Sequence, residues 1–71
     1  MPRLPRISGK EVIKKLKRCG YYEARQQGSH VRLWHDNRPS TSVPLHDIIG
    51  PGLLRQILRE TKLTPEEFAN L

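Results

Sequence analysis

The sequence predicts an α+β fold in the order α-β-β-β-α, with two helices on one face of a three-stranded antiparallel sheet and a short C-terminal helix. Two observations carry this prediction. Apolar residues recur with helical spacing near both ends of the chain, whereas they alternate with period two between them. Each change of period coincides with a turn or a helix-capping signal. A chain of 71 residues has room for one core, so we expect a single domain over residues 1–71.

The first helix is expected over residues 8–19, after an extended arm over residues 1–6 that contains two prolines. Ser8 and Glu11 have the spacing of a capping box, in which each side chain hydrogen-bonds the backbone N–H of the other residue. Gly20 suits the left-handed residue that ends a helix. One side of the helix is apolar, and another is basic. The basic side carries Lys10, Lys14, Lys17 and Arg18.

Three short strands follow, over residues 21–27, 30–35 and 41–45. The first two are joined by Gly28 and Ser29. This is a two-residue hairpin signal, with glycine at the position that needs a positive φ. The first two strands are therefore expected to pair as a β-hairpin.

The alternation in the second strand assigns its side chains to the two faces of the sheet. Val31 and Leu33 are expected to face the core, because neighbouring side chains point to opposite sides of a strand. His30, Arg32 and Trp34 would then share the other face. The solvent-facing side of the sheet is thus predicted to present a histidine, a cation and an aromatic ring.

The second helix is expected over residues 51–61, where Pro51 suits the first helical position. Thr64 and Glu67 form another capping-box pattern, which predicts a short last helix. Two helices on one side of an antiparallel sheet bury their apolar faces there and leave the other side open. This is the layout of a double-stranded-RNA-binding domain.

The positive charge is concentrated at one end of the sequence. The net charge is +6, and residues 1–20 hold seven of the 13 lysines and arginines but one of the seven acidic residues. A basic pole of this kind is typical of proteins that bind a polyanion such as nucleic acid. A solubilising helix face is the alternative that composition leaves open. Membrane binding is disfavoured, because the helix lacks aromatic anchors at its apolar edge.

Several kinds of site are not expected. Cys19 is the single cysteine, so no intramolecular disulfide can form, and no Cys/His spacing resembles a zinc site. No metal or other cofactor is therefore predicted. The N-terminal residues lack the apolar core of a signal peptide, and no apolar run is long enough to cross a membrane. These features lead us to expect a soluble cytoplasmic protein.

Five strings of the sequence, taken in their order and spacing, resemble the HicA (YcfA-like) family of toxins from type II toxin–antitoxin systems. They are SGKEVI at 8–13, RQQGSHV at 25–31, VPLH at 43–46, PGLLRQIL at 51–58 and LTPEEF at 63–68. Together they cover nearly the whole chain. Leu53 departs from the family pattern, which usually has a small polar residue after the Pro-Gly pair.

The resemblance implies a metal-independent endoribonuclease, an mRNA interferase that binds and cleaves mRNA and is neutralised by a HicB-type antitoxin. The family's catalytic histidine is that of the Gly-Ser-His motif, which corresponds to His30, with Gly28 and Ser29 supporting it. The residues alone leave this open, because Gly28 and Ser29 would serve the hairpin geometry in any case. A non-catalytic RNA-binding module of the same fold is the alternative. A domain that only docks an acidic partner is a third interpretation.

The chemistry agrees with the resemblance at His30. Cleaving RNA without a metal requires a base that accepts the proton of a 2′-hydroxyl, and neutral imidazole is available near pH 7. Arg32, two residues further along the strand, could stabilise charge on the phosphate or be a solvated strand cation. The basic side of the first helix (Lys10, Lys14, Lys17 and Arg18) would contact phosphates without reading sequence.

The remaining rings allow more than one interpretation. Trp34 could stack a base, cover the sheet or contact the antitoxin. His46 could form an acid–base pair with His30, although the family motif assigns the essential role to one histidine. His35 is expected to be structural. Tyr21 and Tyr22 are expected to be core and rim residues rather than platforms for bases.

Overall fold

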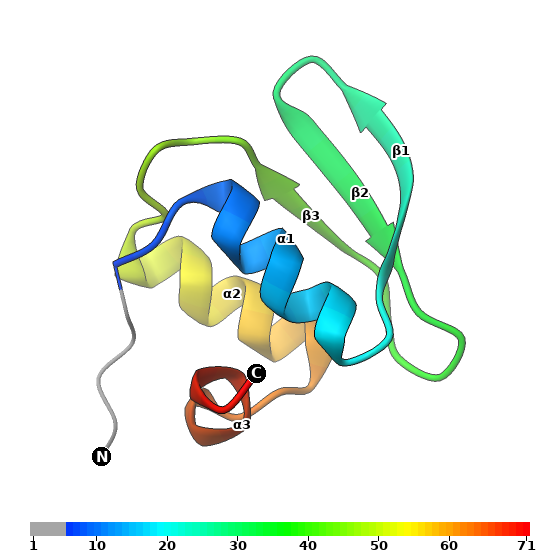
Figure 1. The fold of residues 1–71 in the computed structure, drawn as a ribbon, viewed down its shortest axis with the longest axis vertical. Coiled ribbons are helices and arrows are strands. Elements are labelled where there is room, and N and C mark those ends of the chain that lie inside the picture. Colours follow the sequence, from blue (N-terminus) through cyan, green and yellow to red (C-terminus); the bar gives the residue numbers. More distant parts are fainter. Residues whose placement is uncertain (1–5) are drawn as a thin grey trace.

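The computed structural model describes residues 6–71, so all but the last residue of the expected N-terminal arm lies outside the described part. Its helices are α1 (Gly9–Arg18), α2 (Pro51–Thr61) and α3 (Pro65–Ala69), and its strands are β1 (Tyr22–Gln27), β2 (His30–Trp34) and β3 (Thr41–Pro44). The predicted order of elements is confirmed, and each predicted end of α1, α2 and the strands agrees within one residue. The strands form one antiparallel sheet in the order β1-β2-β3. Figure 1 shows α1 and α2 layered against this sheet.

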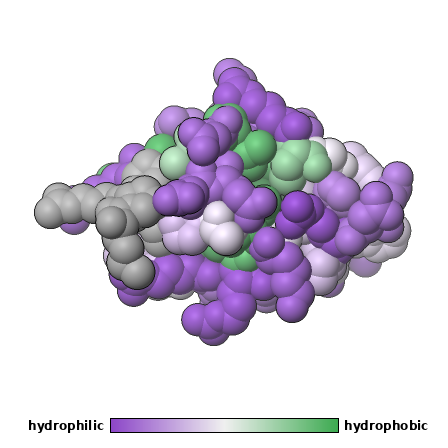
Figure 2. All heavy atoms as spheres, turned by 90° about the horizontal axis from the view of Figure 1, so that it is seen from below, coloured by the Kyte–Doolittle hydropathy of each residue, from purple (hydrophilic) through white to green (hydrophobic). Residues whose placement is uncertain are grey.

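One hydrophobic core fills the space between the helices and the sheet. Val12 and Leu16 of α1, Leu33 of β2, Leu54 of α2 and Phe68 of α3 are all 0% exposed. Removing such side chains from water is the main force that holds the elements together. Hydrophilic residues cover most of the surface when the molecule is seen from the end where α3 lies (Figure 2).

The ends of α1 follow the sequence signals with one difference. The hydroxyl of Ser8 accepts a hydrogen bond from the backbone N–H of Glu11 at 3.2 Å, but it also donates to the Glu11 carboxylate at 3.3 Å. The reciprocal bond of the predicted capping box is therefore replaced by a bond between side chains. At the other end Gly20 has φ +107°, and the N–H of Tyr21 donates to the carbonyl of Leu16, as in a Schellman motif.

Close contact between α1 and β3 depends on Gly9. A Cβ on this residue would lie 2.0 Å from the carbonyl oxygen of Pro44. The N–H of Gly9 also donates to the carbonyl oxygen of His46 at 2.9 Å. The absence of a side chain at Gly9 thus allows α1 to approach β3, and the hydrogen bond holds the backbone of His46 beside the N-terminal end of α1.

β1 contains a bulge that the sequence pattern does not predict. The pairing register of β1 with β2 shifts between Glu23 and Arg25, and Ala24 has no partner. An extra residue in one strand reverses which of its side chains face each side of the sheet. Tyr22 and Gln27, which are five positions apart, therefore lie on the same face.

Candidate active site on the open face of the sheet

The face of the sheet away from the helices carries the predicted catalytic residue. In β2, His30, Arg32 and Trp34 are exposed, whereas Val31 and Leu33 are 1% and 0% exposed. This confirms the predicted division of β2 between core and solvent. The open face is the side of the sheet that carries His30, Arg32 and Trp34.

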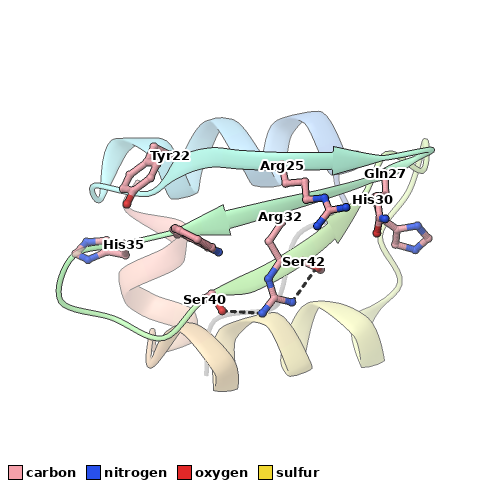
Figure 3. Close-up of a pocket in the computed structure, with 9 residues that line it drawn as sticks. Tyr22, Arg25, Gln27, His30, Arg32, His35, Ser40 and Ser42 are labelled. Atoms are coloured by element: carbon pink, nitrogen blue, oxygen red, sulfur yellow. Dashed lines mark hydrogen bonds between the residues drawn. The ribbon is translucent and has the colours of Figure 1, made fainter.

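The open face has an ordered layout along β1 and β2. His30 lies at the hairpin end, Arg25 and Arg32 lie in the middle, and Tyr22 lies at the far end (Figure 3). Trp34 lies beside Tyr22, as its partner in the sheet. These side chains line a shallow depression of about 560 Å³ in the open face. No aspartate or glutamate lines it. The opposed pairs are Gln27 with His30, Arg25 with Arg32, and Tyr22 with Trp34.

The two arginines in the middle create a positive centre. The guanidinium of Arg32 donates to the hydroxyls of Ser40 at 2.9 Å and Ser42 at 3.4 Å, so it points toward β3 rather than along the strand to His30. Arg25 lies directly opposite Arg32 in the pairing register. Like charges at opposed positions repel, and no carboxylate of residues 6–71 forms a salt bridge with either arginine. An anion bound between them would relieve this repulsion.

The Gly-Ser-His motif positions His30 through the backbone. Gly28 has φ +56°, as the hairpin prediction requires, and a Cβ there would meet nothing within 4 Å. The carbonyl of Ser29 accepts from the N–H of Leu45 at 2.6 Å, which ties the hairpin end to the chain after β3. The ring of His30 is exposed to solvent. The motif therefore holds the backbone of His30 and leaves its ring exposed to solvent.

A second hollow runs from the open face toward α2, and both His30 and His46 line it. His46 follows Pro44 by two residues, and Pro44 is the partner of His30 in the sheet. The structure thus brings together the two histidines that the sequence left as an open acid–base pair. Within residues 6–71, neither of these two rings takes part in a hydrogen bond, whereas the ring of His35 does.

That third histidine, His35, is part of the framework. Its Nδ1 accepts from the backbone N–H of Asn37, so Nε2 carries the proton and donates to the carbonyl of Cys19, both at 2.9 Å. The ring meets Tyr21 edge-on, with centroids 4.8 Å apart, and the Tyr21 hydroxyl donates to the carbonyl of Pro39. Burial raises the pKa of both Tyr21 and the Cys19 thiol.

The basic residues of α1 lie on the other side of the sheet from His30. Three of them line a groove between α1 and the β1–β2 hairpin, which they share with Gln26 and Glu23. Lys17 forms a salt bridge with Glu23 across this groove. The predicted site residues therefore divide into two surfaces, with His30 and Arg32 on the open face and the predicted phosphate contacts on the helix side. The latter are Lys10, Lys14, Lys17 and Arg18, all exposed.

Sequence reasoning missed the contribution of β1 to the open face. Every residue of this strand is exposed, so no apolar alternation marks its two sides. Counting outward from the two-residue turn would have paired Arg25 with Arg32. The same count would have placed Glu23 opposite Trp34. Only the bulge puts Tyr22 there instead, on the open face and 47% exposed, whereas the sequence led us to expect it at the rim of the core.

Within residues 6–71, no three or more His, Cys, Asp or Glu side chains are grouped as metal ligands would be. No helix of this part of the chain is long and apolar enough to cross a membrane.

The family model described as the HicA toxin of bacterial toxin–antitoxin matches residues 9–63. The chain belongs to the HicA toxin family. It is therefore a toxin of a toxin–antitoxin pair, and its family implies an antitoxin partner. The match includes α1, the whole sheet and α2, and no curated protein matches the sequence.

Proposed function

We propose that this HicA-family toxin is an endoribonuclease that cleaves mRNA without a metal ion, with His30 as the general base. One observation carries the proposal. An exposed histidine ring lies at one end of a depression that no acidic residue lines and that has two opposed arginines in its middle. Such a face attracts a phosphodiester and offers it a proton acceptor.

The proposed reaction begins when His30 takes the proton of a 2′-hydroxyl. The 2′ oxygen forms a bond to the neighbouring phosphorus, and the bond from phosphorus to the 5′ oxygen breaks. The products are a 2′,3′-cyclic phosphate and a 5′-hydroxyl end. Positive charge from Arg25 and Arg32 would stabilise the negative charge on the phosphate oxygens.

The departing 5′ oxygen needs a proton, and His46 is the candidate donor. It lines the same hollow as His30, and its backbone is held by Gly9. Two histidines around one phosphate can act as base and acid, because an imidazole ring can accept a proton or donate one. The net result is the transfer of one proton from the 2′ oxygen to the 5′ oxygen.

The basic side of α1 would increase affinity for RNA by contacting phosphates away from the reacting bond. The proposed protein partner is a HicB-type antitoxin, and neutralisation would require it to cover His30. The proposed place of action is the cytoplasm, where mRNA is translated.

The decisive experiment compares purified wild type and His30→Ala on an end-labelled single-stranded RNA. We expect the variant to fold normally and to cleave about 10²-fold more slowly, because its exposed ring contributes a proton acceptor and no core volume. Arg59→Ala, which changes an exposed cation of α2 outside both hollows, is the control. If wild type and His30→Ala cut equally fast, His30 is not the base. If both bind RNA and neither cuts it, the protein is a binding module.

A further inference from the structure

We propose that Tyr22 and Trp34 form a stacking site for one unpaired base of the RNA, so that the substrate must be single-stranded near the cut. This deepens the proposed function. The position of the base relative to the cut rests on cleavage at His30, whereas the stacking itself does not.

The two rings form an exposed pair that the core does not use. Tyr22 and Trp34 are direct partners in the β1–β2 register, and their exposed fractions are 47% and 51%. Neither belongs to the hydrophobic core or to the side chains packed against it. Large aromatic surfaces left in water at one place on a small domain are typical of binding sites. Aromatic rings of this kind bind unpaired bases by stacking.

The bulge in β1 is what creates this pair. With regular pairing from the hairpin, Glu23 would lie opposite Trp34, and its carboxylate would repel RNA on the open face. In the structure, the bulge at Ala24 moves Glu23 to the helix side, where it pairs with Lys17, and brings Tyr22 to the open face. Bulges often serve to redirect side chains at functional sites.

The positive charge of the open face disfavours an apolar protein segment, and its combination with the two rings favours RNA over an acidic one. The depression is lined by Arg25 and Arg32 between the rings and His30, and no acidic residue lines it. A chain that places a base on the rings and a phosphate at the arginines satisfies both features at once. A double helix keeps its bases stacked on one another, so it has none to offer to the rings.

The length of β2 sets where the stacked base should be. Trp34 is four residues from His30, which corresponds to about 13 Å along the strand. Nucleotides in a stacked strand advance about 3.4 Å each and those in a stretched strand more, so the base lies roughly two to four nucleotides from the cleaved bond.

The test uses the only tryptophan of the chain as its probe. The full chain carrying His30→Ala, which is expected to slow cleavage about 10²-fold, is titrated with an unstructured oligoribonucleotide and with the same sequence as a duplex. We expect saturable quenching of Trp34 fluorescence by the single strand and little change with the duplex. Tyr22→Leu and Trp34→Leu should weaken binding of the labelled single strand about 5- to 150-fold. Ile48→Ala is the control, because it removes a similarly exposed apolar side chain that lines neither hollow. It should not weaken binding of the single strand.

Cleavage gives an independent measurement. The substrates are a series of oligonucleotides, each with one abasic nucleotide at a different position. Wild type should cut slowly only the one whose abasic nucleotide lies two to four nucleotides from the cut. Tyr22→Leu should cut all of them at a similar rate. If the single strand leaves the fluorescence unchanged, or if neither leucine variant binds RNA more weakly, the stacking site is wrong even if RNA is still cleaved. Quenching without any cleavage would keep the stacking site and reject the nuclease. A response of Trp34 to the antitoxin and not to RNA would make the rings a protein-docking site.

Discussion

The ammonium group of Lys15 donates a hydrogen bond to the carbonyl oxygen of Leu71 at 3.0 Å. It also lies 5.4 Å from the centre of the Phe68 ring, with the Phe68 carbonyl at 3.5 Å. One cation of the basic first helix therefore caps α3, which lies outside the segment matched to the HicA family.

This interaction distinguishes two neighbouring lysines. Lys15→Ala should lower the free energy of unfolding by roughly 1 kcal/mol, because it removes a charged hydrogen bond and a cation–π interaction. Lys14→Ala, one position away and exposed, should change it little. Urea unfolding followed by circular dichroism measures both. Equal decreases would mean that Lys15 does not hold α3.

The salt dependence of RNA binding tests the groove beside α1. Replacing Lys10 and Lys14 by glutamine should reduce the slope of log affinity against log salt by about 0.7 for each phosphate of a single strand that the protein no longer neutralises. Lys17→Gln should reduce it less, because Lys17 already pairs with Glu23. Arg59→Gln on α2 is the control. An unchanged slope in the Lys10 and Lys14 variants would make the basic side of α1 a solvated surface.

Some features of the fold and of the site can be predicted from the sequence, and others cannot. Caps, turns and apolar periodicity are local, so they locate α1, the hairpin and α2 within a residue and place His30 on the open face. The bulge at Ala24 has no local signal, since β1 has no buried side chain to set its faces. The hydrogen bond of Lys15 with Leu71 joins residues 56 positions apart, which no pattern in one sequence indicates.

Two glycines in helices should respond in opposite ways to the same substitution. Gly9→Ala should lower the free energy of unfolding by about 3 kcal/mol, because its Cβ would collide with the Pro44 carbonyl. Gly52→Ala in α2 meets nothing within 4 Å and should raise it by up to about 1 kcal/mol, because alanine favours helix. Thermal and urea unfolding report both signs. A mild effect at Gly9 would show that α1 can move away from β3.

The cap of α3 predicts a pH dependence of stability. The backbone N–H of Thr64, and then its hydroxyl, hold the pKa of Glu67 below its ordinary value. A carboxylate with a lowered pKa stabilises the fold above its unfolded pKa, which is about 4.3, and this contribution is lost as the pH falls through the folded value. Wild type should therefore be more stable than Glu67→Gln near pH 7, and the difference should shrink below pH about 4. A difference that is constant with pH would exclude the charged cap.

His46 offers the sharpest test of the proposed chemistry. If it protonates the departing 5′ oxygen, His46→Ala should cleave ordinary RNA about 10²-fold more slowly. A substrate with sulfur in place of the 5′ bridging oxygen releases a thiolate, which needs no proton to leave. On that substrate His46→Ala should match wild type, whereas His30→Ala should stay slow, because the 2′-hydroxyl must still lose its proton.

The sulfur substrate separates acid catalysis from a merely structural role. His46 is held by Gly9 and lies near the cross-strand partner of His30, so its removal could also disturb the site. A disturbed site would slow both substrates equally, and Arg59→Ala should slow neither. Full activity of His46→Ala on ordinary RNA would mean that water supplies the proton. Recovery on the sulfur substrate alone would identify His46 as the acid and leave His30 as the base.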